Sequence, residues 1–130
     1  MLNSPNGDIA DNAAIIFDTV SVEIGTAISY NETTGVFTIS QNGYYLVNWW
    51  VALDGSVATT GANFSLNVNG SPHSTGASPS VIGQLSGSAL IVVDAGPVTV
   101  TLTNESGELI NLEDVYAQAN ITILALPMPV

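Results

Sequence analysis

Residues 43–53 read GYYLVNWWVAL, a run of aromatic, aliphatic and β-branched side chains that only Asn48 interrupts. This composition is typical of a β-strand. Because side chains alternate across a strand, the run has two faces: Tyr45, Val47, Trp49 and Val51 share one, and Tyr44, Leu46, Asn48 and Trp50 share the other. Both faces are largely apolar. We therefore expect one to pack inside a sandwich and the other to be covered by further chain or by another subunit.

Strand-like segments continue along most of the chain. The turn Gln41-Asn42-Gly43 separates residues 35–40 from the central run, and an Asn-Gly pair in this position predicts a hairpin. The further strand candidates are residues 14–22, 26–30, 62–69, 88–93, 98–104, 108–112 and 115–126. Turn residues recur about every eight to twelve positions, which indicates an all-β, antiparallel sandwich or barrel.

Two segments stand apart from this pattern. Residues 70–81 are rich in Ser, Gly and Pro, and we predict a long polar loop there. Residues 112–119 fit one turn of helix about as well as a strand. A length of 130 residues suits one domain, which we place at residues 14–126, after a linker or extended segment (1–13) and before a tail (127–130).

The charge balance narrows the classes of partner. The chain has eleven acidic residues, one histidine, and no lysine, arginine or cysteine, so its formal net charge is −11. Without cations it has nothing to neutralise phosphates, so nucleic-acid binding and attraction to anionic lipids are excluded. Disulfides and thiolate metal sites are excluded as well. No apolar run reaches the length of a membrane span. Trypsin-like proteases find no lysine or arginine to cleave after, and we expect resistance to them.

Several motifs in order carry a family resemblance: Ile16-Phe17-Asp18, Gly35-x-Phe37-Thr38, Gly43-x-Tyr45-x-Val47-x-Trp49, Ser86-Gly87-Ser88-Ala89-Leu90 followed by Gly96, and the closing residues 119–124. Over residues 14–126 the chain resembles the complement-subcomponent globular head of the tumour-necrosis-factor-like superfamily. Within it, residues 43–52 look closest to the C-terminal domains of bacterial collagen-like glycoproteins of the spore exosporium. Animal relatives usually carry Gly-Asp where this chain has Gly96-Pro97, so a calcium site that uses that aspartate does not carry over.

The resemblance implies a fold and a role. The implied fold is an antiparallel jelly-roll β-sandwich of about ten strands. The implied role is a structural, extracellular homotrimer that caps an upstream collagen-like stalk on a spore or cell surface, where it contacts surface glycans or host molecules. No Gly-X-Y period occurs in this chain, as expected of a domain excised from behind such a stalk. The candidates for core or trimer packing are Phe17, Phe37, Tyr45, Val47, Trp49, Leu90, Ile121 and Ile123.

Catalytic groupings are weak, and we predict that the protein is not an enzyme. His73 lies near Ser71, Ser74 and Ser78, but no orienting acid, oxyanion hole or nucleophile elbow accompanies it. The carboxylate pairs Glu105–Glu108 and Glu113–Asp114 lie near turns and read as solubilising charges.

Three alternatives stay open. We expect no cofactor, but calcium on a threefold axis, held by one carboxylate from each subunit, would show no single-chain motif. The Trp49–Trp50 pair could form a sugar-stacking platform, and a carbohydrate- or ligand-binding lectin-like module is the alternative function. The third is glycosylation: Asn-x-Ser/Thr sequons occur at Asn31, Asn63, Asn69, Asn104 and Asn120, although such matches are largely expected from composition in a chain this rich in Asn, Ser and Thr.

Overall fold

The computed structural model describes residues 8–20, 23–54, 61–78, 82–113 and 117–127, and these contain strands but no helix. The strands are β1 (Asp8–Ile9), β2 (Ile28–Asn31), β3 (Val36–Ile39), β4 (Gly43–Asp54), β5 (Ala62–Val68), β6 (Ser71–Ser78), β7 (Ile82–Val93), β8 (Val98–Asn104), β9 (Ile110–Asn111) and β10 (Ala119–Leu126). None of the described segments is a helix long and apolar enough to cross a membrane.

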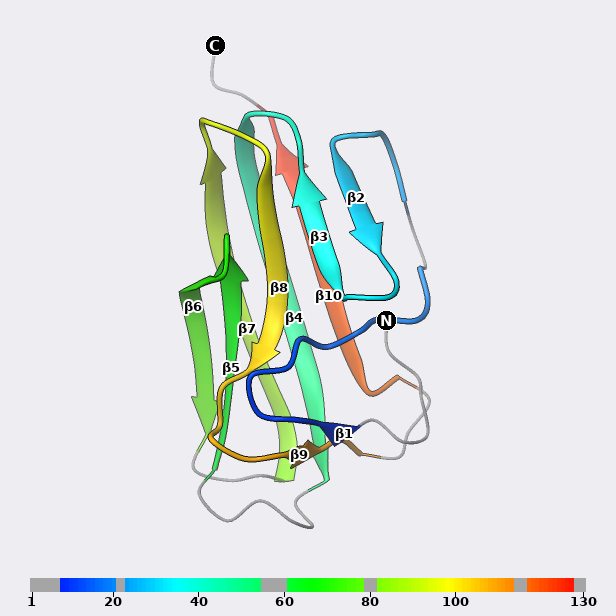
Figure 1. Cartoon of the computed structure of the whole chain (residues 1–130), viewed down its shortest axis with the longest axis vertical. Helices are drawn as coiled ribbons and strands as arrows, with labels where there is room; N and C mark the ends of the chain where they lie inside the picture. Colours follow the sequence, from blue (N-terminus) through cyan, green and yellow to red (C-terminus); the bar gives the residue numbers. More distant parts are fainter. Residues whose placement is uncertain (1–7, 21–22, 55–60, 79–81, 114–116, 128–130) are drawn as a thin grey trace.

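The strands form two facing antiparallel sheets (Figure 1). One sheet has five strands in the order β2-β3-β8-β5-β6, and the other has three in the order β10-β4-β7. The short strands β1 and β9 pair with each other at one end. This arrangement confirms the predicted all-β jelly-roll sandwich of about ten strands.

The core lies between the two sheets, and alternation along β4 supplies one wall of it. Val47 and Val51 are fully buried, while Tyr45 and Trp49 are each 2% exposed. The facing sheet contributes buried side chains from β5 and β8: Phe64, Leu66, Val100 and Leu102. The face predicted for Tyr45 and its alternating partners is therefore the interior face.

The predicted hairpin at Asn42-Gly43 is wrong. β3 pairs with β2 and β8, whereas β4 pairs with β10 and β7, so the chain crosses from one sheet to the other at this turn. Asn42 instead ties the crossing to the β7–β8 turn: its Nδ2 donates to the Asp94 carbonyl and its Oδ1 accepts from the Gly96 amide, both at 3.2 Å. β3 has only four residues, whereas β7 and β10 are long enough to pair with most of β4. Pairing with these two strands therefore buries more of the apolar run of β4 than pairing with β3 would.

The predicted polar loop over residues 70–81 is also wrong for residues 71–78, which form β6 at the edge of the five-stranded sheet. Residues 79–81 lie outside the described residues. The hairpin of β6 with β5 turns at Asn69 and Gly70, whose φ angles of 53° and 82° match the left-handed turn that Asn-Gly favours. An edge strand with largely exposed side chains needs no apolar alternation, which is why β6 lacks a strand signal.

Smaller differences concern the ends of elements. In place of a strand over residues 14–22, the described part of that segment makes one bridge, between Ala14 and Thr103. β7 begins at Ile82, six residues before the predicted start. β1 lies within residues 1–13, and Ile9 joins the core at 7% exposure.

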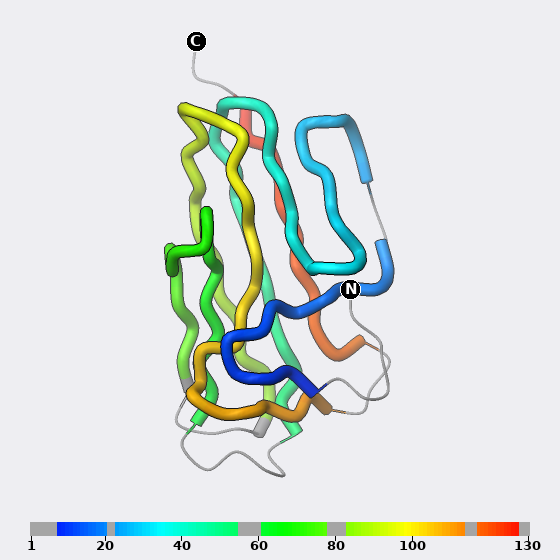
Figure 2. Tube along the Cα trace, viewed as in Figure 1, coloured from blue at the N-terminus to red at the C-terminus, as the bar shows by residue number. Residues whose placement is uncertain are grey.

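Aromatic side chains close the two sides of the sandwich. On the side where β6 and β7 approach each other, the Trp49 indole lies against Gly76 and Gly87. On the other side the chain after β1 runs towards β2 (Figure 2), and the Tyr30 hydroxyl donates to the Phe17 carbonyl and accepts from the Phe17 amide. The Phe37 ring lies 4.4 Å from that of Tyr30, centroid to centroid.

Candidate functional site

The outer face of the three-stranded sheet is the candidate interaction face. Partners in an antiparallel ladder point to the same side, so the register of β4 with β7 and β10 defines its rows. We call two of them the apolar rows: Tyr44 with Val92 and Leu126, and Leu46 with Leu90 and Leu124. We call the next two the polar rows: Asn48 with Ser88 and Thr122, and Trp50 with Ser86 and Asn120. None of these twelve side chains is charged.

The apolar rows leave large aliphatic side chains in contact with solvent. Leu90 is 51% exposed, Val92 54% and Leu124 55%. They lie together because Val92 and Leu90 follow each other on one side of β7, and Leu124 faces them across β4. A contiguous apolar patch that a folded chain leaves uncovered marks an interaction surface more often than a single exposed leucine does.

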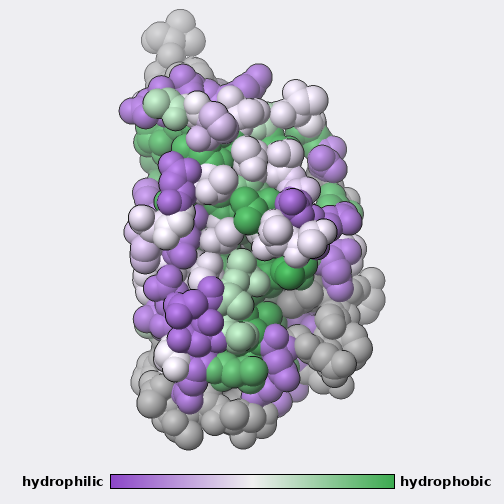
Figure 3. Space-filling model, in the orientation of Figure 1, coloured by the Kyte–Doolittle hydropathy of each residue, from purple (hydrophilic) through white to green (hydrophobic). Residues whose placement is uncertain are grey.

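The outer face of the five-stranded sheet is different in character. Figure 3 views that face, where hydrophilic and weakly polar side chains cover most of the area. Along β8 the buried Val98, Val100 and Leu102 alternate with exposed Thr99 and half-buried Thr101. The five-stranded sheet thus has the polar outer face that a sandwich presents to water, whereas the outer face of the three-stranded sheet is apolar in two of the four rows described above.

A hollow of about 400 Å³ lies over the polar rows. Asn48, Trp50, Ser86, Ser88, Asn120 and Thr122 contribute to its lining. Trp50 is half-buried, in contrast to Trp49, which points into the core. Within the described residues, the only hydrogen bond between these side chains is a long one, 3.5 Å from Asn120 Nδ2 to Thr122 Oγ1.

The predicted packing residues fall into three groups. Phe17, Tyr45, Val47 and Trp49 belong to the buried core, and Phe37, Ile121 and Ile123 are half-buried against it. Leu90 alone lies on the outer face. Alternation along β4 had already separated Tyr44, Leu46 and Trp50 from the interior side chains. The roles of Val92 and Leu124 were missed because their position beside Leu46 and Leu90 depends on register between distant strands.

The histidine and serine candidates do not assemble a catalytic triad. His73 is exposed on β6, and its Nε2 lies 3.0 Å from the Leu90 carbonyl oxygen across the gap to β7. Ser74 Oγ donates to the Ser88 carbonyl at 3.4 Å in the same gap. In the described part of the chain, no hydrogen bond joins His73 to a carboxylate or a serine hydroxyl. Both side chains therefore cover the free edge of β7.

Of the acidic candidates, Glu105 accepts a hydrogen bond through its carboxylate, and Glu108 and Glu113 accept side-chain hydrogen bonds through their backbone carbonyls. Glu105 Oε1 accepts from Asn67 Nδ2 at 3.3 Å, and the Glu108 and Glu113 carbonyls accept from Asn104 and Gln118 side chains. Asp114 lies outside the described residues. Those residues contain no group of three or more histidine or acidic side chains placed to hold a metal.

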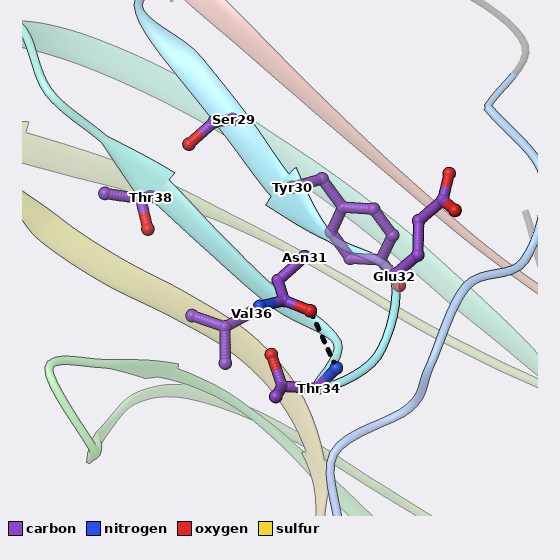
Figure 4. Close-up of a pocket in the computed structure, with 7 residues that line it drawn as sticks. All are labelled: Ser29, Tyr30, Asn31, Glu32, Thr34, Val36 and Thr38. Atoms are coloured by element: carbon purple, nitrogen blue, oxygen red, sulfur yellow. Dashed lines mark hydrogen bonds between the residues drawn. The ribbon is translucent and has the colours of Figure 1, made fainter.

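The sequons differ in accessibility. Asn104 is fully buried, so its side chain is closed to modification in the folded domain. Asn31 lies at the β2–β3 turn beside a shallow hollow of about 660 Å³ (Figure 4). Its Oδ1 accepts from the amides of Thr33 and Thr34 at 2.9 and 3.2 Å, and the side chain thereby holds the turn.

Comparison with known proteins supports the fold. No protein-family model matches the chain, and no curated protein matches it. Rabbit GITRL, of the tumour-necrosis-factor superfamily, is similar in structure with a TM-score of 0.59 and 19% identity over 79% of each chain. Pika GITRL has a TM-score of 0.57 and 17% identity, over 80% of this chain and 87% of its own. At these identities the likeness shows a tumour-necrosis-factor-like jelly roll, the fold that the resemblance implied.

Proposed function

We propose that this domain forms a homotrimer through the apolar rows on the outer face of its three-stranded sheet, and that the trimer caps a collagen-like stalk on a spore or cell surface. The observation that supports it is the group of half-exposed aliphatic side chains in the apolar rows, Leu90, Val92 and Leu124. Extracellular location and contact with surface glycans or host molecules belong to the same proposal.

Self-association through the apolar rows is favourable because it removes apolar area and desolvates no charge. A fully buried leucine contributes about 1.5–3 kcal/mol relative to an exposed one, so covering half-exposed Leu90 and Leu124 is worth about 1 kcal/mol each. Every subunit of a symmetric assembly contributes this gain. The net charge of −11 opposes association at long range, and salt weakens that opposition.

The threefold order and the stalk rest on the family resemblance. A trimer holds three chain ends together, which raises their effective concentration for triple-helix formation. A fusion of the domain to a Gly-Pro-Pro repeat tests this role. We expect the collagen circular-dichroism signal to melt at a higher temperature in the fusion than in the free repeat; equal melting temperatures would contradict a capping function.

Substitution in the apolar rows tests the interface itself. We expect Leu90→Asp and Leu124→Asp to convert trimer into monomer in native mass spectrometry, because each places a carboxylate against apolar neighbours. The matched control is Thr99→Asp, an exposed strand position on the other sheet, which should leave the trimer intact. The interface would lie elsewhere if Leu90→Asp and Leu124→Asp both remained trimeric, or if only the control Thr99→Asp dissociated into monomers.

No cofactor and no catalytic activity are part of this proposal. A calcium titration followed by thermal melting tests the cofactor expectation: an unchanged melting temperature agrees with it, and saturable stabilisation by calcium contradicts it. The absence of lysine and arginine also predicts that trypsin leaves the folded and the unfolded chain intact.

A further inference from the structure

We infer that the polar rows form a binding groove for a neutral saccharide, with the Trp50 indole as its stacking platform. The groove is the hollow of about 400 Å³ over the outer face of β4, β7 and β10. This inference does not depend on trimer formation, because it concerns a different part of the sheet from the apolar rows.

The geometry places one aromatic ring among small polar side chains. Trp50 on β4 is flanked by its ladder partners Ser86 and Asn120, and the next row places Ser88 and Thr122 beside Asn48. Serine partners are short, and Trp50 stays half-buried where Trp49 is buried. A pyranose ring stacks its axial C–H groups on such an indole face while its hydroxyls reach outward to polar neighbours.

The hydrogen-bonding groups of the groove are not used within the described fold. Apart from the long Asn120–Thr122 contact, the side chains of the polar rows make no hydrogen bond to another described residue. Each amide and hydroxyl both donates and accepts. Hydroxyls of a saccharide likewise donate and accept, and they match this set, whereas a purely apolar ligand would leave it unpaired.

Charge selects a neutral ligand. The groove has no acidic or basic side chain, and the whole chain has no lysine or arginine to pair with a sulfate, phosphate or uronate. The net charge of −11 further disfavours anionic ligands. Neutral hexoses, pentoses and N-acetylhexosamines are the class that fits.

The two tryptophans have separate roles in this account. Trp49 is 2% exposed and its ring lies on Gly76 and Gly87 inside the sandwich, so it is closed to a ligand. Both residues of the predicted Trp49–Trp50 platform line the hollow, but only the Trp50 side chain lies on the outer face, while the Trp49 side chain is buried on the inner face. A ligand would therefore perturb the Trp50 indole and leave the Trp49 indole unchanged.

Titration of the full chain with cellohexaose, xylohexaose and chitohexaose tests the inference, with indole N–H resonances recorded by NMR. We expect saturable shifts of the Trp50 indole with at least one of these saccharides, and none with an oligogalacturonate of the same length. Trp50→Ala should weaken binding about tenfold. Ser86→Glu, which fills and charges the groove while leaving Trp50 in place, should abolish binding. The control Thr99→Glu, on the opposite sheet, should bind as the unaltered chain does.

Three results would overturn the inference of a saccharide-binding groove: no saturable shift with any neutral saccharide, preferential binding of the oligogalacturonate, or binding that survives both Trp50→Ala and Ser86→Glu. If Trp50→Ala does not fold, the effect of Ser86→Glu on saccharide binding is the test, and unchanged binding overturns the inference. Light scattering with and without saccharide separates this inference from the trimer. A trimer that binds no saccharide overturns the groove alone, and a monomer that binds saccharide overturns the trimer alone.

Discussion

The Trp49 indole lies directly on the bare backbone of Gly87, its ladder partner across β4 and β7. A methyl group added at Gly87 would lie 2.6 Å from ring atom Cζ2 and 2.7 Å from Cε2. The far edge of the same ring meets Gly76 on β6, where an added methyl group would lie 2.7 Å from Cη2. Trp49 thus spans the gap between the sheets because both neighbours lack side chains.

Gly87→Ala is expected to destabilise the fold by about 1–3 kcal/mol, since a rigid, buried ring has no room to yield. Chemical denaturation of the variant measures this. Ser88→Ala, which removes an exposed hydroxyl on the same strand, is the control and should change stability by less than about 0.5 kcal/mol.

A double-mutant cycle identifies the ring as the cause. Trp49 Nε1 is buried with no hydrogen-bond partner in the described part of the chain, so replacing the indole costs no hydrogen bond there. Trp49→Phe should therefore recover part of the loss caused by Gly87→Ala. Strict additivity of the two changes would show that the glycine acts through something other than Trp49.

Tyr30 predicts how stability changes at alkaline pH. Desolvation raises the pKa of the Tyr30 hydroxyl above 10.0, and Glu32 and Asp18 add to this, while the bond to Phe17 acts in the opposite direction. Because the folded pKa is the higher one, folding favours the protonated phenol. Its contribution is complete below pH 10 and is lost as pH rises through the folded pKa.

Denaturation between pH 7 and pH 11 tests this, without interference from lysine titration. The unaltered chain should lose stability above about pH 10, and Tyr30→Phe should be less stable at pH 7 but lose less on going to pH 11. Parallel curves for the two proteins would contradict a role for the phenol.

Asn104 should be the most sensitive polar residue in the fold. It is fully buried, and its Nδ2 donates to the Ile9 and Glu108 carbonyls at 2.9 Å and to the Ala10 carbonyl at 3.3 Å. Its removal leaves buried carbonyls unpaired. We expect Asn104→Ala to cost about 2–4 kcal/mol. Asn31→Ala, at an exposed turn, should cost about 1 kcal/mol or less; equal losses would contradict this assignment.

Local patterns predict the elements here better than the connections between them. Alternation along residues 43–53 correctly separated the Val47 face from the Leu46 face, since strand geometry alone determines it. The Asn-Gly signal predicted a hairpin at Asn42 that does not form, whereas the Asn-Gly pair at Asn69 does turn a hairpin, whose second strand was predicted as a polar loop. Whether the strands on either side of an Asn-Gly turn pair with each other depends on which distant strands bury their apolar side chains. The dipeptide itself carries no such information.

The same limit applies to the candidate face. β6 is polar, so its residues carry no sign of this edge strand. Leu124 and Leu90 lie beside Leu46 because of the register of β10 and β7 on β4, which the sequence does not show. The groove around Trp50 likewise requires Ser86 and Asn120 as neighbours, which lie far from it in sequence.

Sedimentation equilibrium of the unaltered chain across a range of micromolar concentrations tests the trimer most directly. With a subunit mass of 13.4 kDa, the account predicts a single species of three times that mass, about 40 kDa, favoured by added salt. A species of 13.4 kDa at every concentration would contradict it.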